Sequence, residues 1–217
     1  MVVVMTERDR LFSFIKENYE TDEPVFLSDL KVQNMKTVTI RQEIRNLIGE
    51  GRLKKFDSGI YYLPSSSPLF GTSVLSIDEV IRKKYLLDEA GCCGYIAGIL
   101  LANELRLTTQ VPSVYEIYTN RATSLYRETE LASRRIIIRK PCCKVTQDNV
   151  YALQLLDLVK EITDVAEVET DVIRKRISQY MDKFGLTFNS IEPFISFYPD
   201  KIYRNLYEVG LLNGKTA

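Results

Sequence analysis

Basic side chains gather between Lys31 and Phe56, where the sequence carries seven Lys or Arg residues and two acidic ones. The first 30 residues show the opposite balance, with seven acidic residues and three basic ones. Lysine and arginine bind phosphate oxygens, and Arg and Gln also hydrogen-bond the edges of guanine and adenine. The formal net charge of the whole chain is zero, so binding to a polyanion depends on this uneven distribution. The sequence predicts a small N-terminal domain with an acidic side and a basic side.

Catalysis has little support in the residue types. Histidine is absent, which removes the commonest general base and the commonest metal ligand. The four cysteines form two adjacent pairs, Cys92-Cys93 and Cys142-Cys143, unlike the spaced pairs of structural zinc sites, so free thiols are expected. There is no phosphate-binding loop, and no lysine lies two residues after Glu116, as a metal-dependent nuclease would require. We therefore expect a binding protein that is not an enzyme and has no cofactor and no metal.

The basic residues need elements that hold them on one surface, and the first 63 residues predict such a set. A helix is expected at residues 6–19, capped by Thr6, and a short strand at 25–27. A helix of about two turns around Leu30 and Val32, begun by Ser28 or Asp29, is expected next, followed by a turn at 33–35. A longer helix is expected at 37–49, and a hairpin at 52–63 turns at Asp57-Ser58-Gly59.

The helix expected at 37–49 has one apolar stripe and one polar face. Ile40, Ile44, Leu47 and Ile48 share the stripe, which must pack against the rest of the domain. This order of elements is typical of a winged helix-turn-helix, whose recognition helix lies in the major groove of DNA. A solvated helix face, or a winged helix that contacts protein, would show the same pattern. The candidate DNA-binding residues are Lys36, Thr37, Thr39, Arg41, Gln42, Arg45, Lys54 and Lys55.

The rest of the chain predicts a second domain. Residues 64–68, Pro-Ser-Ser-Ser-Pro, are interpreted as a linker between a winged helix at 5–63 and a mixed α/β domain at 69–217, so the expected fold class is α+β. Strands are expected at 114–119, 126–131 and 134–140, and helices at about 77–85, 95–105, 150–163 and 167–184. Arg174, Lys175, Arg176 and Lys183 are expected on a solvated helix face.

Neither a membrane span nor a secretion signal is expected. No apolar run approaches the roughly 18 to 20 residues that cross a bilayer. Met1 to Met5 lacks the length and the basic start of a signal peptide. A cytoplasmic location is therefore expected.

Three segments in order resemble the AbiEi-type antitoxins and their DUF6088 relatives over most of the chain. The first, Gly59-Ile60-Tyr61-Tyr62-Leu63-Pro64, matches the end of that family's wing, G-x-Y-x-x-P. The second, residues 98–112, holds a helix of small residues and a turn similar to L-G-L-T-x-Q-x-P, with Arg106 where glycine would be expected. The third is the strand at 115–120 that follows.

The resemblance implies a protein of a bacterial toxin-antitoxin or phage-defence operon. Its winged helix would bind inverted repeats in double-stranded DNA of its own promoter and act as a repressor. Its second domain would counteract a nucleotidyltransferase-like toxin, with or without direct contact between the two proteins. Two alternatives remain open: a transcription regulator whose second domain responds to a ligand, and a winged-helix module that binds another protein.

Overall fold

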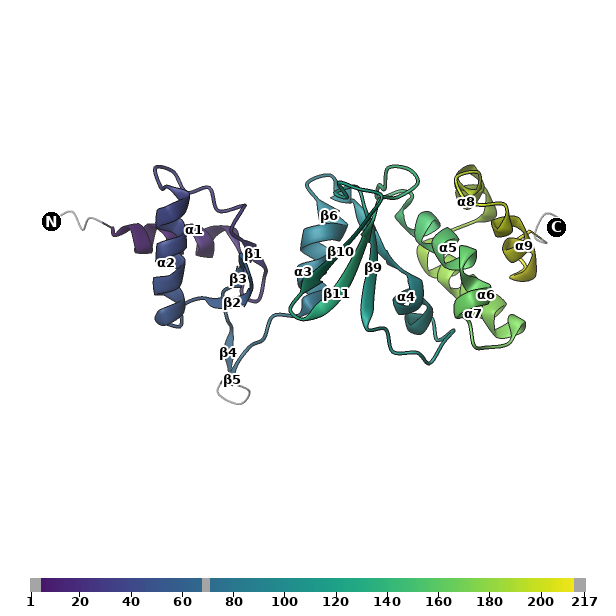
Figure 1. Cartoon of the computed structure of the whole chain (residues 1–217), viewed down its shortest axis with the longest axis horizontal. Helices are drawn as coiled ribbons and strands as arrows, with labels where there is room; N and C mark the ends of the chain where they lie inside the picture. The colour runs from purple at the N-terminus through teal and green to yellow at the C-terminus, as the bar shows by residue number, and fades with distance from the viewer. Residues whose placement is uncertain (1–4, 68–70, 213–217) are drawn as a thin grey trace. The chain divides into compact units, whose positions relative to one another are not determined.

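Two compact units make up the chain, an N-terminal unit from Met1 to Lys83 and a C-terminal unit from Lys84 to Ala217. The structure, a computed structural model, describes residues 5–67 and 71–212 (Figure 1). Both units combine helices with β-sheet, so the expected α+β class is confirmed at that level.

The N-terminal unit places two helices against a small antiparallel sheet. Thr6 caps the first helix by accepting a hydrogen bond from the backbone N–H of Asp9, as predicted. The sheet has the strand order β1-β3-β2, and Gly59 takes the positive φ of +71° that the hairpin turn requires. The elements are α1 (Glu7–Asn18), β1 (Val25–Phe26), α2 (Thr37–Gly49), β2 (Lys54–Asp57), β3 (Ile60–Tyr62), β4 (Ser66–Ser67), β5 (Gly71–Thr72) and α3 (Ile77–Ile81).

The apolar stripe of α2 packs into the core of this unit as its period predicts. Ile40, Ile44 and Leu47 are at most 3% exposed, and they join Leu11 and Ile15 of α1 in one cluster. Burial of this stripe turns the opposite face of α2 outward.

The helix expected around Leu30 and Val32 does not form, so that prediction is wrong. The backbone instead makes isolated short-range bonds, from the N–H of Asp29 to the carbonyl of Phe26 and from that of Lys31 to Asp29. The hydroxyl of Ser28 bonds the Asp29 carboxylate at 2.8 Å rather than capping a helix. Polar side chains that bond locally compete with helical hydrogen bonds, and so short a segment does not offset the cost of helix nucleation.

The segment expected to be a linker is instead held within the N-terminal unit. Ser65 donates to the Asp22 carboxylate from its hydroxyl, at 2.6 Å, and from its backbone N–H, at 3.3 Å; Ser73 donates to it as well. Ser66 and Ser67 pair with Thr72 and Gly71 in a short hairpin. The compact unit consequently extends to Lys83, beyond the expected boundary at residue 63, while Pro68 lies outside the described residues.

The C-terminal unit is built on a mixed four-stranded sheet with the order β10-β11-β9-β8. The strand β11 runs parallel to β9 and antiparallel to β10. A short π-helix, η1 (Arg82–Leu86), crosses the unit boundary. The other elements are β6 (Leu87–Asp88), β7 (Gly91–Cys92), β8 (Gly94–Ala97), α4 (Gly98–Glu104), β9 (Val114–Thr119), β10 (Tyr126–Leu131), β11 (Arg134–Arg139), α5 (Val150–Lys160), α6 (Ile162–Val165), α7 (Thr170–Phe184), α8 (Phe188–Ile195) and α9 (Lys201–Glu208).

The strands at 114–119 and 126–131 and the helices around 77–85 and 150–163 form close to where the pattern predicts them. Tyr95 is an exception, because it lies in β8 and not in the helix expected at 95–105. Ile136 and Ile138 of β11 are buried, while Arg135 and Arg139 pair with Glu128 and Glu116. The arginines of β11 therefore lie at the two ends of a strand that places these two isoleucines in the core.

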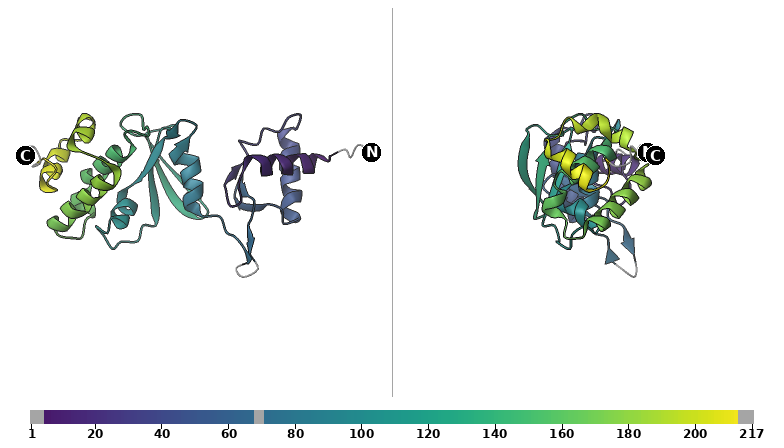
Figure 2. Two further views of the ribbon diagram at one scale, coloured as in Figure 1. Left: turned by 180° about the vertical axis from the view of Figure 1, so that it is seen from behind. Right: turned by 90° about the vertical axis from the view of Figure 1, so that its right-hand side faces the viewer.

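The helix α5 is the centre of the C-terminal unit. It lies between β8 on one side and α8 and α9 on the other, and the views of Figures 1 and 2 agree on this arrangement. Eight of its residues are buried, among them Asp157. None of the helices in the described part of the chain is long and apolar enough to cross a membrane.

Candidate nucleic-acid interface

The outward face of α2 carries three exposed polar side chains, those of Arg41, Gln42 and Arg45. Gln42 donates to Asn46 at 3.3 Å, and Arg45 donates to Gln42 at 3.5 Å. These weak hydrogen bonds lie between neighbouring surface side chains, which can exchange them for bonds to a ligand. Val38, which is 77% exposed, adds an apolar side chain near the N-terminal end of α2.

The N-terminal end of α2 is also open to a ligand. Lys36 is the N-cap residue and Thr37 the first residue of the helix, and both are exposed. Lysine has no acceptor atom, so it leaves the N–H groups of the first turn without the side-chain cap that Ser or Asp would provide. Free N–H groups at a helix N-terminus favour a phosphate. Thr39, by contrast, is half-buried and contributes less to this surface.

The two acidic residues between Lys31 and Phe56 form ion pairs with arginines. Glu43 pairs with Arg8 at 3.2 Å, and Glu50 pairs with Arg8 and Arg52. A hydrogen bond from Asn46, followed by the contact with Arg8, holds the pKa of Glu43 below its usual value. Arg52 also stacks on the ring of Phe12 at 3.7 Å, so it belongs to the structure of the unit. The positive charges of Arg41 and Arg45 therefore dominate the outward face.

The two lysines of the hairpin lie on opposite faces of it. Lys54 pairs with Tyr62 and Lys55 with Tyr61, and adjacent residues of a strand point to opposite sides of the sheet. Lys55 is exposed, whereas Lys54 is half-buried. The sequence alone did not distinguish the two lysines as phosphate ligands. The register of the hairpin shows that they lie on different faces.

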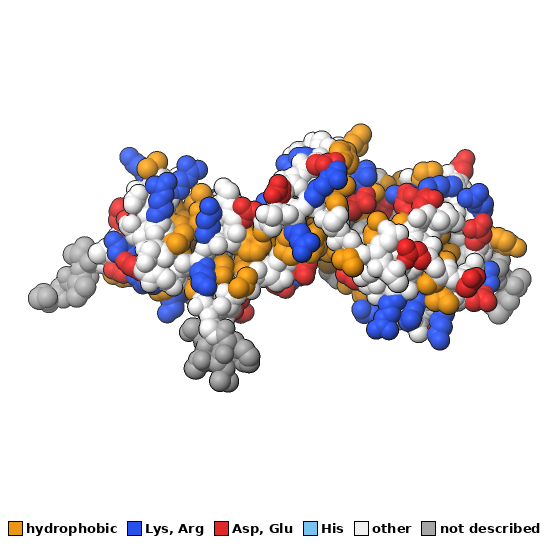
Figure 3. All heavy atoms as spheres, turned by 60° about the horizontal axis from the view of Figure 1, so that its bottom comes forward, with side chains coloured by type: hydrophobic (Ala, Val, Ile, Leu, Met, Phe, Trp, Pro, Cys, Tyr) orange, Lys and Arg blue, Asp and Glu red, His pale blue; other side chains and the backbone are white. Residues whose placement is uncertain are grey.

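Figure 3 shows one face of the N-terminal unit with Lys and Arg side chains spread among apolar and uncharged ones, and with Asp and Glu at its margins. The structure thus leaves most of the predicted site residues exposed on α2 and the hairpin. Among the eight predicted site residues, those that are both charged and exposed are Lys36, Arg41, Arg45 and Lys55.

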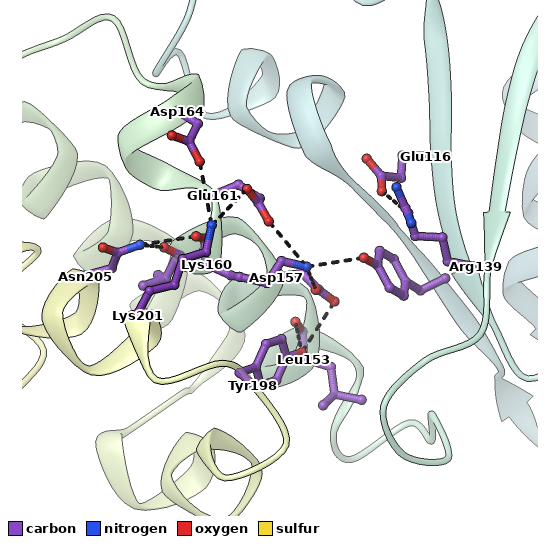
Figure 4. Close-up of polar contacts among 12 residues, drawn as sticks. Glu116, Arg139, Leu153, Asp157, Lys160, Glu161, Asp164, Tyr198, Lys201 and Asn205 are labelled. Atoms are coloured by element: carbon purple, nitrogen blue, oxygen red, sulfur yellow. Dashed lines mark hydrogen bonds and ion pairs between the residues drawn. The ribbon is translucent and has the colours of Figure 1, made fainter. Parts of the chain in front are cut away.

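The C-terminal unit holds a second candidate site that the sequence pattern does not reveal. A pocket of about 390 Å³ lies between the sheet and α5, and we call it the polar pocket; its charged residues are Glu116, Arg139, Asp157, Lys160 and Glu161. In Figure 4 Glu116 and Arg139 come from the sheet, and the other three from α5 and the residue that follows it. The available signal in the sequence was an aspartate among the leucine and valine residues of α5.

Asp157 organises the polar pocket. It is 4% exposed and accepts hydrogen bonds from the hydroxyls of Tyr95 and Tyr198 and, at 2.8 Å, from the ammonium of Lys160. Burial alone lowers the pKa of Lys160, but the Asp157 carboxylate outweighs it and raises that pKa above 10.5. Burial and the same carboxylate raise the pKa of Tyr118 to about 12. The charged groups satisfy one another, as expected of a network that fixes α5 against the sheet.

The cysteines are present as free thiols, and Cys93 is buried. Burial raises the pKa of the Cys92 and Cys93 thiols, which disfavours the reactive thiolate. Within residues 5–67 and 71–212, no three His, Cys, Asp or Glu side chains are placed to share a metal ion.

Comparison with known protein families finds no family model that matches this sequence, and comparison with curated proteins finds no match.

Proposed function

We propose that the N-terminal unit is a winged helix-turn-helix that binds double-stranded DNA, with α2 in the major groove and the β2–β3 hairpin as the wing. The observation that carries this proposal is the exposed pair Arg41 and Arg45, which lie one turn apart on α2. The nearby carboxylates, Glu43 in the helix and Glu50 after it, pair with Arg8. Arginine on an exposed helix face suits a bidentate contact with guanine. Two turns, at residues 27–29 and 33–34, lie where the first helix of the motif would be expected.

A DNA-binding experiment distinguishes a specific contribution of Arg41 and Arg45 from the effect of losing two positive charges anywhere on the protein. Arg41→Ala with Arg45→Ala is expected to weaken binding to a fragment of the protein's own promoter by at least about tenfold, since each base or phosphate contact contributes roughly 1 to 3 kcal/mol. Lys175→Ala with Arg204→Ala, exposed residues of α7 and α9, removes the same charge from the C-terminal unit and is the matched control. Equal affinities in fluorescence anisotropy for both double variants would reject the proposed interface.

We further propose, from the resemblance to AbiEi-type antitoxins, that this binding represses a toxin-antitoxin operon and that the protein counteracts a nucleotidyltransferase-like toxin. It would do so in the cytoplasm and by binding rather than catalysis. The proposal expects a nucleotidyltransferase-like reading frame beside the gene for this protein, and co-expression of the two proteins tests the antitoxic role. Rescue of growth supports the proposal, and toxicity unchanged by this protein contradicts it.

A ligand-responsive regulator is the second candidate function, because the C-terminal unit has pockets in which polar and apolar groups converge. In that case a small molecule bound by the C-terminal unit would change the affinity for promoter DNA. A protein-binding winged helix predicts instead that promoter DNA and unrelated DNA bind equally weakly.

A further inference from the structure

Three basic side chains of the C-terminal unit meet at a pocket of about 260 Å³, which we call the basic pocket. Arg106 comes from the residues after α4, and Arg176 and Lys183 come from α7, two turns apart. Glu104 is the acidic residue of the lining. The excess of positive charge selects for an anion.

Arg176, which lines this pocket, has one buried donor without a partner. Its Nε atom is buried and has no hydrogen-bond acceptor among the described residues, while its Nη1 donates to Gln179 at 3.3 Å. A buried donor left without a partner costs roughly 1 to 3 kcal/mol. This residue was expected on a solvated helix face, and its partial burial corrects that prediction. That Nε atom is too buried for a bound anion to reach while the side chain keeps this position, so Arg176 contributes its positive charge to the basic pocket.

Arg106 has a backbone conformation that disfavours any side chain. Its φ is +56°, in the left-handed region, and its N–H donates to Asn103 at 2.8 Å to close the end of α4. A residue with a Cβ atom costs roughly 1 to 2 kcal/mol there, a cost that glycine avoids. An arginine at this position extends a cationic side chain to the basic pocket while adding local strain, which is the pattern of a functional position.

The rest of the lining suits the organic part of a ligand. Leu101, Leu105 and Phe184 provide apolar surface, and Tyr180 is fixed by donating to Gln154 at 2.6 Å. The volume is just below the roughly 300 to 1,000 Å³ of typical small-molecule sites, so a compact ligand fits best. The arginine fork matches the geometry of a phosphate, and lysine adds a point charge.

We propose that the basic pocket binds a small phosphate monoester, with the phosphate on Arg106, Arg176 and Lys183 and the organic group on the apolar lining. This proposal does not depend on the DNA-binding role of the N-terminal unit.

Calorimetric titration and thermal unfolding of the full chain test the proposal, with adenosine monophosphate and inorganic phosphate as probes at equal ionic strength. The wild type is expected to bind the monoester more tightly than inorganic phosphate, since the monoester also contacts the apolar lining. Arg106→Gly is expected to leave the ligand-free protein equally or more stable, because it relieves the left-handed strain, and to weaken monoester binding at least about tenfold. If the role of Arg106 were purely structural, Arg106→Gly would not weaken monoester binding while leaving the stability of the ligand-free protein unchanged or higher.

Arg176→Gln checks the second cation, and Lys175→Ala is the matched control, since Lys175 is exposed on α7 and does not line the basic pocket. The glutamine variant is expected to lose monoester binding, and the control to keep it. The proposal is overturned if the wild type binds neither probe, if inorganic phosphate binds as tightly as the monoester, if Arg106→Gly binds as the wild type does, or if nucleic acid binds this unit and the small probes do not.

Discussion

Glu167 accepts two hydrogen bonds from Thr109, one from its backbone N–H at 2.7 Å and one from its hydroxyl at 2.9 Å, although 58 residues separate them. The second carboxylate oxygen accepts from the side chain of Gln110 at 3.0 Å, and the N–H of Glu167 donates to the carbonyl of Leu107. The segment between α4 and β9 is thereby held against the residues before α7. Thr109 and Gln110 therefore have a structural role.

The contact with Thr109 predicts a pH-dependent stability. The backbone N–H of Thr109, followed by Gln110, lowers the pKa of Glu167 from 4.5 to about 2. A carboxylate whose pKa is depressed in the folded state stabilises it above pH 4.5, and this contribution disappears as the pH falls toward 2. Glu167→Gln is expected to remove that part of the pH dependence. Urea midpoints measured from pH 7 to pH 3 check this, and a difference between variant and wild type that does not change with pH contradicts it.

Asp157→Ala is expected to destabilise the C-terminal unit by about 1 to 3 kcal/mol, because the buried hydroxyls of Tyr95 and Tyr198 lose an acceptor and half-buried Lys160 keeps only the more distant Glu161, at 3.7 Å, as a counter-charge. Lys160→Met in the Asp157→Ala background should recover part of that stability, since it removes a half-buried charge that has lost its nearer partner. Chemical denaturation of both single variants and the double variant measures the coupling.

Arg204 and Glu208 of α9 provide the control for that coupling. They form an ion pair at 3.8 Å with side chains that are 68% and 45% exposed, and exposed pairs contribute about 0 to 1 kcal/mol. Equal couplings in the two pairs would show that Asp157 has no special part in the packing of α5.

Lys55 is expected to contribute more to DNA binding than Lys54, provided that the hairpin is a wing, because the two lie on opposite faces and Lys55 is the exposed one. Lys55→Ala should reduce the slope of log K against log salt by about 0.9, since one fewer phosphate charge is then neutralised on binding. Lys54→Ala should change it less. Anisotropy titrations at several salt concentrations give both slopes, and the reverse order would argue against this orientation of the hairpin.

Helix α2 shows how far local pattern reaches in this chain. The repeat of Ile40, Ile44 and Leu47 predicts both the bounds and the buried side of this helix, because helical periodicity depends on residues only three or four positions apart. The segment around Leu30 has too few residues for such a signal, and there the prediction fails. The serines after Pro64 read as a linker in sequence because their partner, Asp22, lies more than 40 residues earlier.

The sequence by itself determined the mixed α+β class, the basic face of α2 and the hairpin that follows, since periodicity, capping and turn chemistry act between residues a few positions apart. The tertiary structure alone decided which charges remain available. It paired Glu43 with Arg8 and stacked Arg52 on Phe12. It also buried Asp157 beside half-buried Lys160, and it brought Arg106 to Arg176 and Lys183. These outcomes depend on interactions between segments far apart in the chain, which no local pattern specifies.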